Sequence, residues 1–337
     1  MAGGAHEAEV SRLWSEAAEA LNEDDHRRAM ALGKRLVRLR FSGGWEVMAR
    51  AYVLRDQLER AIATLERGLK LVPEAGALWM QLGICQDDAG RWSASQRSFE
   101  RALACPHHDA DAIWANWGAM LVRAGQPTEA LAALGRLSDG AEPELRLFAQ
   151  VQRLAALNRA ERWAECIAAA RAWLPTVPAE ADPELLGQAL GLVALALARS
   201  GGDPAEVRAA ALQALSHWRV IATALEALRL LRGVRSAANC VWLVSFEGTA
   251  TRLVSPDEGP LGFFTSYEVI ADSEELAVAL ARELERESEP EPLRVERVSR
   301  LDAVPDRLQG VIGRNGYILF DRDAGPRRGF WQRLLRR

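Results

Sequence analysis

The sequence contains few of the residues that usually carry catalysis, metal binding or covalent cross-links. Its 337 residues include only 5 histidines and 4 cysteines. The cysteines lie in separate apolar stretches without the close spacing of a zinc site, at Cys85, Cys105, Cys166 and Cys240. We therefore expect free, buried thiols in a reducing compartment, the cytoplasm. Because no Ser/His/Asp or Cys/His motif occurs either, the sequence predicts no catalytic residue, no metal site and no cofactor.

Long hydrophobic runs and an excess of positive charge are also missing. The apolar stretch Leu185–Ala198 is shorter than the roughly 20 residues that a membrane-spanning helix needs. The segment Met1–Glu7 has neither the cationic start nor the apolar core of a signal peptide. A net charge of -4 does not suit a nucleic-acid-binding protein, which normally has a basic face. We expect no membrane span, no secretion signal and no nucleic-acid partner.

Tryptophan, in contrast, recurs in a pattern. Trp45, Trp79 and Trp114 stand about 34 residues apart. Each is followed by a large apolar residue and then a small one, in Trp45-x-x-Met48-Ala49, Trp79-x-x-Leu82-Gly83 and Trp114-x-x-Trp117-Gly118. Two antiparallel helices of three to four turns with two short turns occupy about this length. The small residue is expected where the two helices cross, because a larger side chain would hold their backbones apart.

This pattern resembles the tetratricopeptide repeat, a helix–turn–helix unit that stacks into a solenoid. The resemblance implies an α-helical solenoid over residues 1–235, with about six helical pairs and a capping helix over residues 216–232. It also implies a non-enzymatic adaptor or scaffold, because such solenoids bind protein partners and have no built-in chemistry. We expect a cytoplasmic bacterial adaptor whose oligomeric state the sequence leaves open.

Position within the repeat selects the candidate binding residues. In tetratricopeptide repeats the first helices line a concave groove, which implies a partner-binding set of Glu46, Arg50, Met80, Ile84, Asp87, Asn116, Ala119, Val151 and Asn158. This groove is polar at its N-terminal end and apolar in the middle, which suits an amphipathic helix or an extended peptide. Only Asn116 matches the carboxylate clamp of chaperone-binding repeats, so we do not expect a chaperone tail. The alternative is a groove that is empty or filled by the chain itself.

The pattern changes from helical to extended near residue 236. Residues 236–323 predict a small α+β domain with a β-β-β-α-β core, followed by a further helix and strand, and with a helix on one face of the sheet. The expected strands are Cys240–Phe246, Thr249–Val254, Phe263–Ala271, Leu293–Val298 and Gly316–Asp321. The expected helices begin at Asp272 or Ser273 and at Leu301, the second ending at Leu308. The alternating glutamates from Glu283 to Glu291 predict a solvated helix end.

Part of this domain resembles a small uncharacterised bacterial domain. Its residues Glu247-Gly248, Gly262–Ser266 and Glu274–Ala277 carry the resemblance, which implies a strand–loop–strand–helix unit and no activity. Arg294–Val298 is similar to the tail of minimal nucleotidyltransferases, but the Gly-Ser pair and the Asp-x-Asp that hold their metal ions are missing. The alternative function is a ligand-binding or enzyme-like module of unrecognised class. A deep pocket with polar side chains converging around Phe263–Glu268 would favour it.

The chain ends in a basic, amphipathic segment over residues 324–337. As a helix it would place Phe330, Trp331 and Leu334 on one face and Arg333, Arg336 and Arg337 on the other. Such a segment predicts contact with an anionic membrane surface or with an acidic partner. The alternative is that its aromatic residues fold back over the open face of the sheet.

Overall fold

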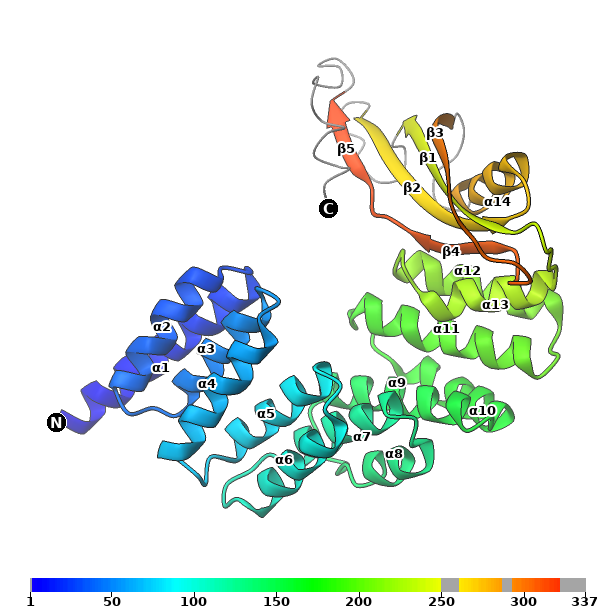
Figure 1. The fold of residues 1–337 in the computed structure, drawn as a ribbon. Coiled ribbons are helices and arrows are strands. Elements are labelled where there is room, and N and C mark those ends of the chain that lie inside the picture. The colour runs from blue at the N-terminus through cyan, green and yellow to red at the C-terminus, as the bar shows by residue number, and fades with distance from the viewer. Residues whose placement is uncertain (1, 250–260, 287–292, 322–337) are drawn as a thin grey trace. The chain divides into compact units, whose positions relative to one another are not determined.

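The computed structural model describes residues 2–249, 261–286 and 293–321 (Figure 1). The chain divides into two compact units, Met1–Ala160 and Glu161–Arg337. The first unit is entirely helical, and the second contains four helices followed by a sheet and a further helix. Within the described residues, none of the helices has the length and apolarity that crossing a membrane requires.

The first unit is an array of consecutive helices. Each helix packs against the next one, and each odd-numbered helix also contacts the next odd-numbered helix. The even-numbered helices of this unit do not approach one another in the same way. Their bounds are α1 (Ala2–Asn22), α2 (His26–Arg38), α3 (Gly43–Val53), α4 (Leu58–Leu71), α5 (Gly76–Asp88), α6 (Trp92–Ala104), α7 (Ala110–Arg123), α8 (Pro127–Leu134) and α9 (Pro143–Arg159).

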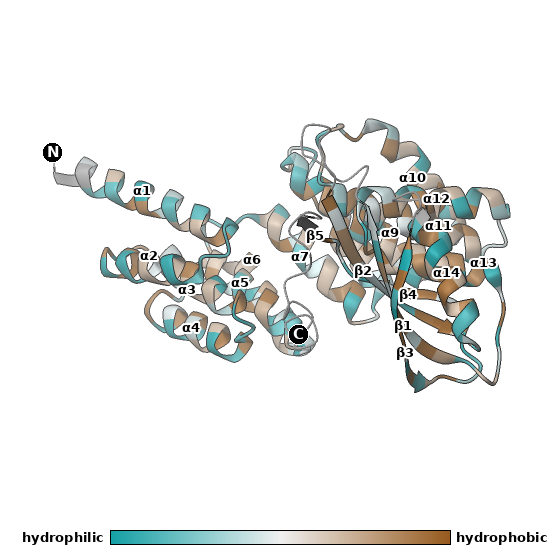
Figure 2. Ribbon diagram, turned by 90° about the horizontal axis from the view of Figure 1, so that it is seen from above, coloured by the Kyte–Doolittle hydropathy of each residue, from teal (hydrophilic) through white to brown (hydrophobic). Residues whose placement is uncertain are grey.

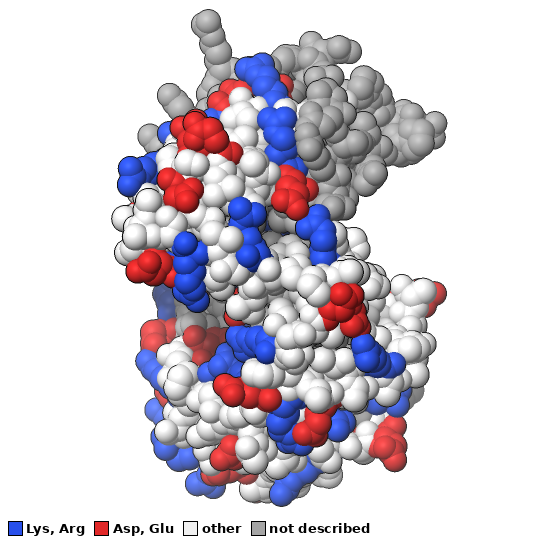
Figure 3. All heavy atoms as spheres, turned by 90° about the vertical axis from the view of Figure 1, so that its right-hand side faces the viewer, with Lys and Arg blue, Asp and Glu red and all other residues white. Residues whose placement is uncertain are grey.

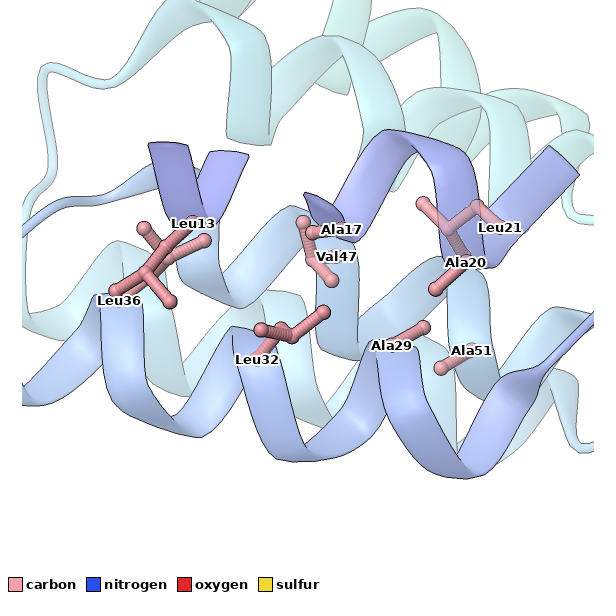
Figure 4. Close-up of a cluster of buried hydrophobic side chains, with 9 residues drawn as sticks. All are labelled: Leu13, Ala17, Ala20, Leu21, Ala29, Leu32, Leu36, Val47 and Ala51. Carbon is pink, nitrogen blue, oxygen red and sulfur yellow. The ribbon is translucent and has the colours of Figure 1, made fainter. Parts of the chain in front are cut away.

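Amphipathic helices build the core of this array. Hydrophilic and hydrophobic residues alternate along α1–α4 in Figure 2, as they do in helices that bury one face. In Figure 4, side chains of α1, α2 and α3 point toward one another in a single buried cluster, which consists of Leu13, Ala17, Ala20, Leu21, Ala29, Leu32, Leu36, Val47 and Ala51. The alanines let the backbones approach closely, while the leucines fill the remaining space.

The small residues of the repeat lie at helix crossings, as the sequence predicts. A Cβ atom on Gly83 of α5 would lie 3.0 Å from the Phe99 ring of α6. A Cβ atom on Gly118 of α7 would lie 2.5 Å from Cγ of Leu134 on α8, too close for any pair of carbon atoms. These glycines therefore set the distance between the two helices of a pair.

The second unit begins with four α-helices, α10 (Trp163–Trp173), α11 (Pro183–Arg199), α12 (Pro204–His217) and α13 (Ala222–Arg232), with a short 3-10 turn η1 (Leu174–Thr176) after α10. The helix expected over residues 216–232 is present as α13, but it begins later than predicted, at Ala222. The chain becomes extended at Trp218, and α13 starts only after Ile221. The β-branched Ile221 favours extended backbone and is buried against Gly191 of α11, where a Cβ atom would lie 2.5 Å from it.

The sheet of the second unit is antiparallel, with the order β3-β1-β2-β4 and with β5 pairing β2. Its strands are β1 (Cys240–Thr249), β2 (Leu261–Ala271), β3 (Arg294–Ala303), β4 (Gly310–Arg314) and β5 (Ile318–Asp321), and α14 (Glu274–Arg286) follows β2. Helix α14 contacts β1, β2, β3 and β4. The predicted α+β class, with a helix on one face of the sheet, is confirmed.

Two predicted elements of this region differ from the structure. The break expected between the strands Cys240–Phe246 and Thr249–Val254 is absent, because β1 continues through Glu247-Gly248 to Thr249, where Gly248 leaves room for the Phe263 ring on β2. The rest of the expected strand Thr249–Val254 lies outside the described residues. The stretch Leu301–Leu308 is not a helix. It completes β3, and then its backbone bonds to the segment before β1, through Val304 N–H to Asn239 O at 2.8 Å and Asp306 N–H to Ser236 O at 3.1 Å. Strand β4 follows, in a stretch where the sequence analysis expected neither a helix nor a strand.

Candidate functional site

Five of the nine predicted partner-binding residues remain at least partly accessible on the odd-numbered helices of the first unit. They form what we call the odd-helix surface, made of Glu46 and Arg50 on α3, Met80 and Ile84 on α5, and Asn116 on α7. Helices α3, α5 and α7 contact one another in sequence, so these residues share one layer of the array.

Met80 and Ile84 form the apolar centre of this surface. They stand one helical turn apart on α5, which places them on one face of the helix. Both side chains are half-buried and pack against a core cluster that includes Ile113 and Met120 of α7. The core thus holds them in place while part of each side chain stays open to solvent.

Polar groups flank this centre on the neighbouring helices. Glu46 is half-buried, and burial raises the pKa of its carboxyl group, while the charge of Arg50 one turn later acts in the opposite direction. Arg50 is exposed. On α7 the side-chain amide of Asn116 donates to the Ala112 carbonyl at 2.8 Å, which fixes the orientation of that side chain.

The other four predicted residues are buried and offer no surface to a partner. Their exposed fractions are 4% for Asp87, 1% for Ala119, 2% for Val151 and 3% for Asn158. The Asp87 carboxylate accepts from Arg123 Nε at 3.0 Å and so ties α5 to α7. The Asn158 amide donates to the Leu154 carbonyl at 3.3 Å. Helix α9 packs on both α7 and α8, and Ala119 on α7 is buried where its counterpart Ile84 on α5 stays partly open.

The predicted tail contacts cannot be placed. Phe330, Trp331, Arg333, Leu334, Arg336 and Arg337 lie outside the described residues. Contact of the tail with a membrane or an acidic partner therefore remains a prediction.

The structure contains an aromatic hollow that the sequence analysis did not single out. The rings of Trp114 and Trp117 stack with centroids 5.1 Å apart, and the rings of Phe99 and Trp117 stack with centroids 6.2 Å apart. The guanidinium of Arg136 lies over Trp114, 4.5 Å from its centroid. The side chains of Trp114, Trp117 and Arg136 border a hollow of about 500 Å³ between α6, α7 and α8. The sequence feature that could have indicated this hollow is Trp117, a second tryptophan at the position where the other repeats have Met48 or Leu82.

A buried polar network occupies the second unit, and it corrects the expectation of a solvated helix end. Glu285 of α14 has an exposed fraction of 0%. Its carboxylate accepts from Arg219 Nη2 at 2.9 Å, from the Tyr317 hydroxyl at 2.6 Å and from the Tyr267 hydroxyl. Burial raises the pKa of Tyr267 far above its usual range; Arg219 opposes this shift and Glu285 adds to it.

Arg219 connects this network to the helices. It lies between α12 and α13, and its guanidinium also donates to the Thr265 hydroxyl at 2.7 Å and to the Asn315 carbonyl at 2.9 Å. The guanidinium stacks on the Tyr317 ring at 3.6 Å. The polar groups that converge around Thr265 and Tyr267 are therefore bonded to one another instead of lining an open pocket.

Charge on the surface is mixed. Figure 3 shows lysine and arginine atoms interspersed with aspartate and glutamate atoms over one side of the molecule. The side shown there has no broad basic field among its described residues. Among the described residues no group of three His, Cys, Asp or Glu side chains could hold a metal ion.

Comparisons with known proteins concern the helical part of the chain. Residues 42–85 match the family model described as a tetratricopeptide repeat. A search of curated protein sequences found no match. Among solved structures, the fold is similar to the APC/C hetero-tetramer Cut9-Hcn1, with a TM-score of 0.53, 12% sequence identity, and coverage of 64% of this chain and 41% of that chain.

Two further structures match with lower scores. They are PilW, a widely conserved type IV pilus biogenesis factor (TM-score 0.48, 19% identity, 56% of this chain and 82% of that chain), and YrrB, a TPR protein with an unusual peptide-binding site (TM-score 0.40, 19% identity, 63% and 97%). The segment 42–85 therefore matches a tetratricopeptide repeat, and the glycine-spaced helical pairs described above have the same helix–turn–helix arrangement.

Proposed function

We propose that this chain is a non-enzymatic adaptor that binds a protein partner along the odd-helix surface. The observation that carries the proposal is the apolar pair Met80 and Ile84, which the core holds in place and which remains partly open to solvent. Repeat arrays of this kind present extended surfaces to partners. The Cut9-Hcn1 structure, whose fold this chain shares in part, is itself a hetero-tetramer.

The chemistry of the surface favours an amphipathic helix or an extended peptide. An apolar stripe on the partner would cover Met80 and Ile84, and its polar flank would meet Arg50 on one side and Asn116 on the other. The exposed guanidinium of Arg50 favours an acidic group at that end of the partner. We propose a cytoplasmic site of action, which fits the burial of all four cysteines.

An enzyme-like role for the sheet region is the weaker alternative. A pocket with converging polar side chains around Phe263–Glu268 would have favoured it, but Thr265 and Tyr267 instead bond to Arg219 and Glu285. Groups that are buried and bonded to one another have no free position near a substrate.

The test compares partner capture by surface variants. Met80→Glu with Ile84→Glu places two charges at the apolar centre, and capture of specific partners from host extract should fall on the order of tenfold or more. Leu71→Glu is the matched control, because Leu71 on the even-numbered helix α4 is 68% exposed. Arg50→Glu is a second variant that leaves the core untouched.

Quantitative mass spectrometry of the captured proteins decides the outcome. The proposal expects the same partners to be lost from the double variant and weakened in Arg50→Glu, with the Leu71→Glu profile like that of the wild type. Equal capture by all four folded proteins would contradict a binding role for this surface. Circular dichroism and thermal unfolding confirm that each variant is folded.

A further inference from the structure

The second unit contains a pocket whose lining combines leucines and arginines. It has a volume of about 240 Å³ and lies between α12, α13, α14 and β4. Its apolar wall includes Leu212 of α12, Leu228 and Leu231 of α13, and Leu280 of α14. The volume is several times the roughly 30 Å³ that one water molecule occupies. The leucines give the pocket an apolar side against which an aliphatic chain can pack.

Arg229 of α13 is held against this pocket by the backbone of β4. Its Nη1 donates to the Val311 carbonyl at 2.8 Å. Gly310, with a φ of +138°, allows the approach, because a Cβ atom there would lie 2.7 Å from Arg229 Cγ. The position of the guanidinium is thus fixed by the fold and does not depend on a ligand.

The charge of Arg229 is poorly compensated. Burial lowers the pKa of its guanidinium, Glu226 opposes this shift, and the nearby charge of Arg307 adds to it. The Glu226 carboxylate already accepts from Arg199 at 2.8 Å. A half-buried cation with one neutral acceptor gains from an anion that enters the pocket.

The charged side chains that line the pocket have a net positive charge. Glu283 is the acidic side chain of the lining, and it accepts from Arg208 at 3.0 Å. Arg232, one turn after Arg229 on α13, is exposed. In the part of the chain that the structure describes, neither Arg229 nor Arg232 has an ion-pair partner within 4.0 Å. Two guanidinium groups therefore face an apolar pocket without a paired carboxylate.

We propose that this pocket binds an aliphatic carboxylate, a fatty acid of medium chain length. The chain would pack against the leucines, and its carboxylate would accept hydrogen bonds from Arg229 and Arg232. This site lies in the second unit and goes beyond the proposed adaptor function, because it needs no protein partner. Its test is therefore independent of the partner-capture experiment.

Octanoate is the probe, and isothermal titration calorimetry with the full chain is the measurement. Wild-type protein should bind octanoate saturably at one site. Octanol, which has the same chain and no charge, should bind on the order of tenfold more weakly or not at all. No saturable octanoate binding, or equal binding of octanol, would overturn the proposal.

Two variants locate the site. Arg229→Met keeps the aliphatic stem and should lose octanoate binding by on the order of tenfold or more. Arg232→Gln, at an exposed position that does not endanger folding, should weaken it severalfold. Arg97→Gln on α6 of the first unit removes the same charge elsewhere and should bind like wild type. If Arg232→Gln and a folded Arg229→Met both bind as wild type does, the pocket is not the site.

Discussion

In the first unit, neighbouring helices meet through alanine and glycine, and each helix depends on the one before and the one after it. In the second unit, elements far apart in the sequence are joined by buried charge. Arg219 between α12 and α13 contacts Thr265 on β2, Glu285 on α14 and Asn315 after β4. The first arrangement can be extended by repetition and leaves side chains such as Met80 open to a partner. The second arrangement makes the last helices and the sheet depend on each other.

The difference also bears on what each unit can do. An array of similar pairs presents one layer of helices along its length, which suits a long, thin ligand such as a peptide. A unit in which helices, sheet and α14 enclose a space between them suits a small ligand instead. The odd-helix surface is the proposed peptide site of the first unit, and the pocket between α12, α13, α14 and β4 is the proposed small-ligand site of the second.

Breaking the buried network should have the largest effect. Arg219→Ala removes the cation that donates to the buried Glu285 carboxylate, so the free energy of unfolding should fall by about 3–5 kcal/mol. Arg171→Ala, which removes an exposed ion pair with Glu206 in the same unit, should change it by less than about 1 kcal/mol. Chemical denaturation of both variants measures the difference. Similar losses in the two would show that the network contributes no more than a surface pair.

A change at a helix crossing should have the next largest effect, and it should act on the first unit. Gly83→Leu forces a side chain against the Phe99 ring and should lower the free energy of unfolding by about 1–3 kcal/mol. Gly4→Ala, at a position with no atom within 4 Å of the added Cβ, is the control and should not destabilise. Thermal unfolding monitored by circular dichroism is the measurement. An unchanged melting temperature for Gly83→Leu would remove the crossing role of this glycine.

The smallest effect is expected at Glu46, and it depends on pH. Burial raises the carboxyl pKa in the folded protein, so the folded state binds a proton more tightly than the unfolded state does. This group therefore disfavours folding once the pH rises above its folded pKa, and the penalty disappears below the unfolded value. Glu46→Gln should therefore stabilise the protein slightly at pH 7 and not at pH 3. A variant that is destabilising at pH 7 would show that the Glu46 charge favours the fold.

The repeats were predictable because their signal is local and periodic. The contacts that the repeat residues make are local. Gly83 lies where α5 crosses α6, and Trp79 and Trp114 pack against the cores of their own and neighbouring helical pairs. The covered positions were not predictable in this way. Ala119 stands at the repeat position of Ile84, which stays partly open, yet Ala119 is buried on α7, which packs against both α8 and α9.

In the second unit the sequence indicated the main strands and α14 but not what joins them. Residues Arg219 and Glu285 lie far apart in the chain, and no spacing rule connects them. Glu285 belongs to a run of alternating glutamates, which is typical of solvated segments, yet the network buries it completely. Strand β4 was missed for a related reason, since Gly310 and Gly313 weaken its local pattern and pairing with β2 supplies its stability.

Site-specific photo-crosslinking in the native host tests the binding role of the first unit most directly. A photoreactive residue at Ile84 or Arg50 of the odd-helix surface should crosslink to the same partner protein, identified by mass spectrometry. The same residue at Leu71 on α4 should give no such product. Crosslinks to that partner of equal yield from Leu71, or none from either surface position, would contradict the proposal that the odd-numbered helices bind the partner.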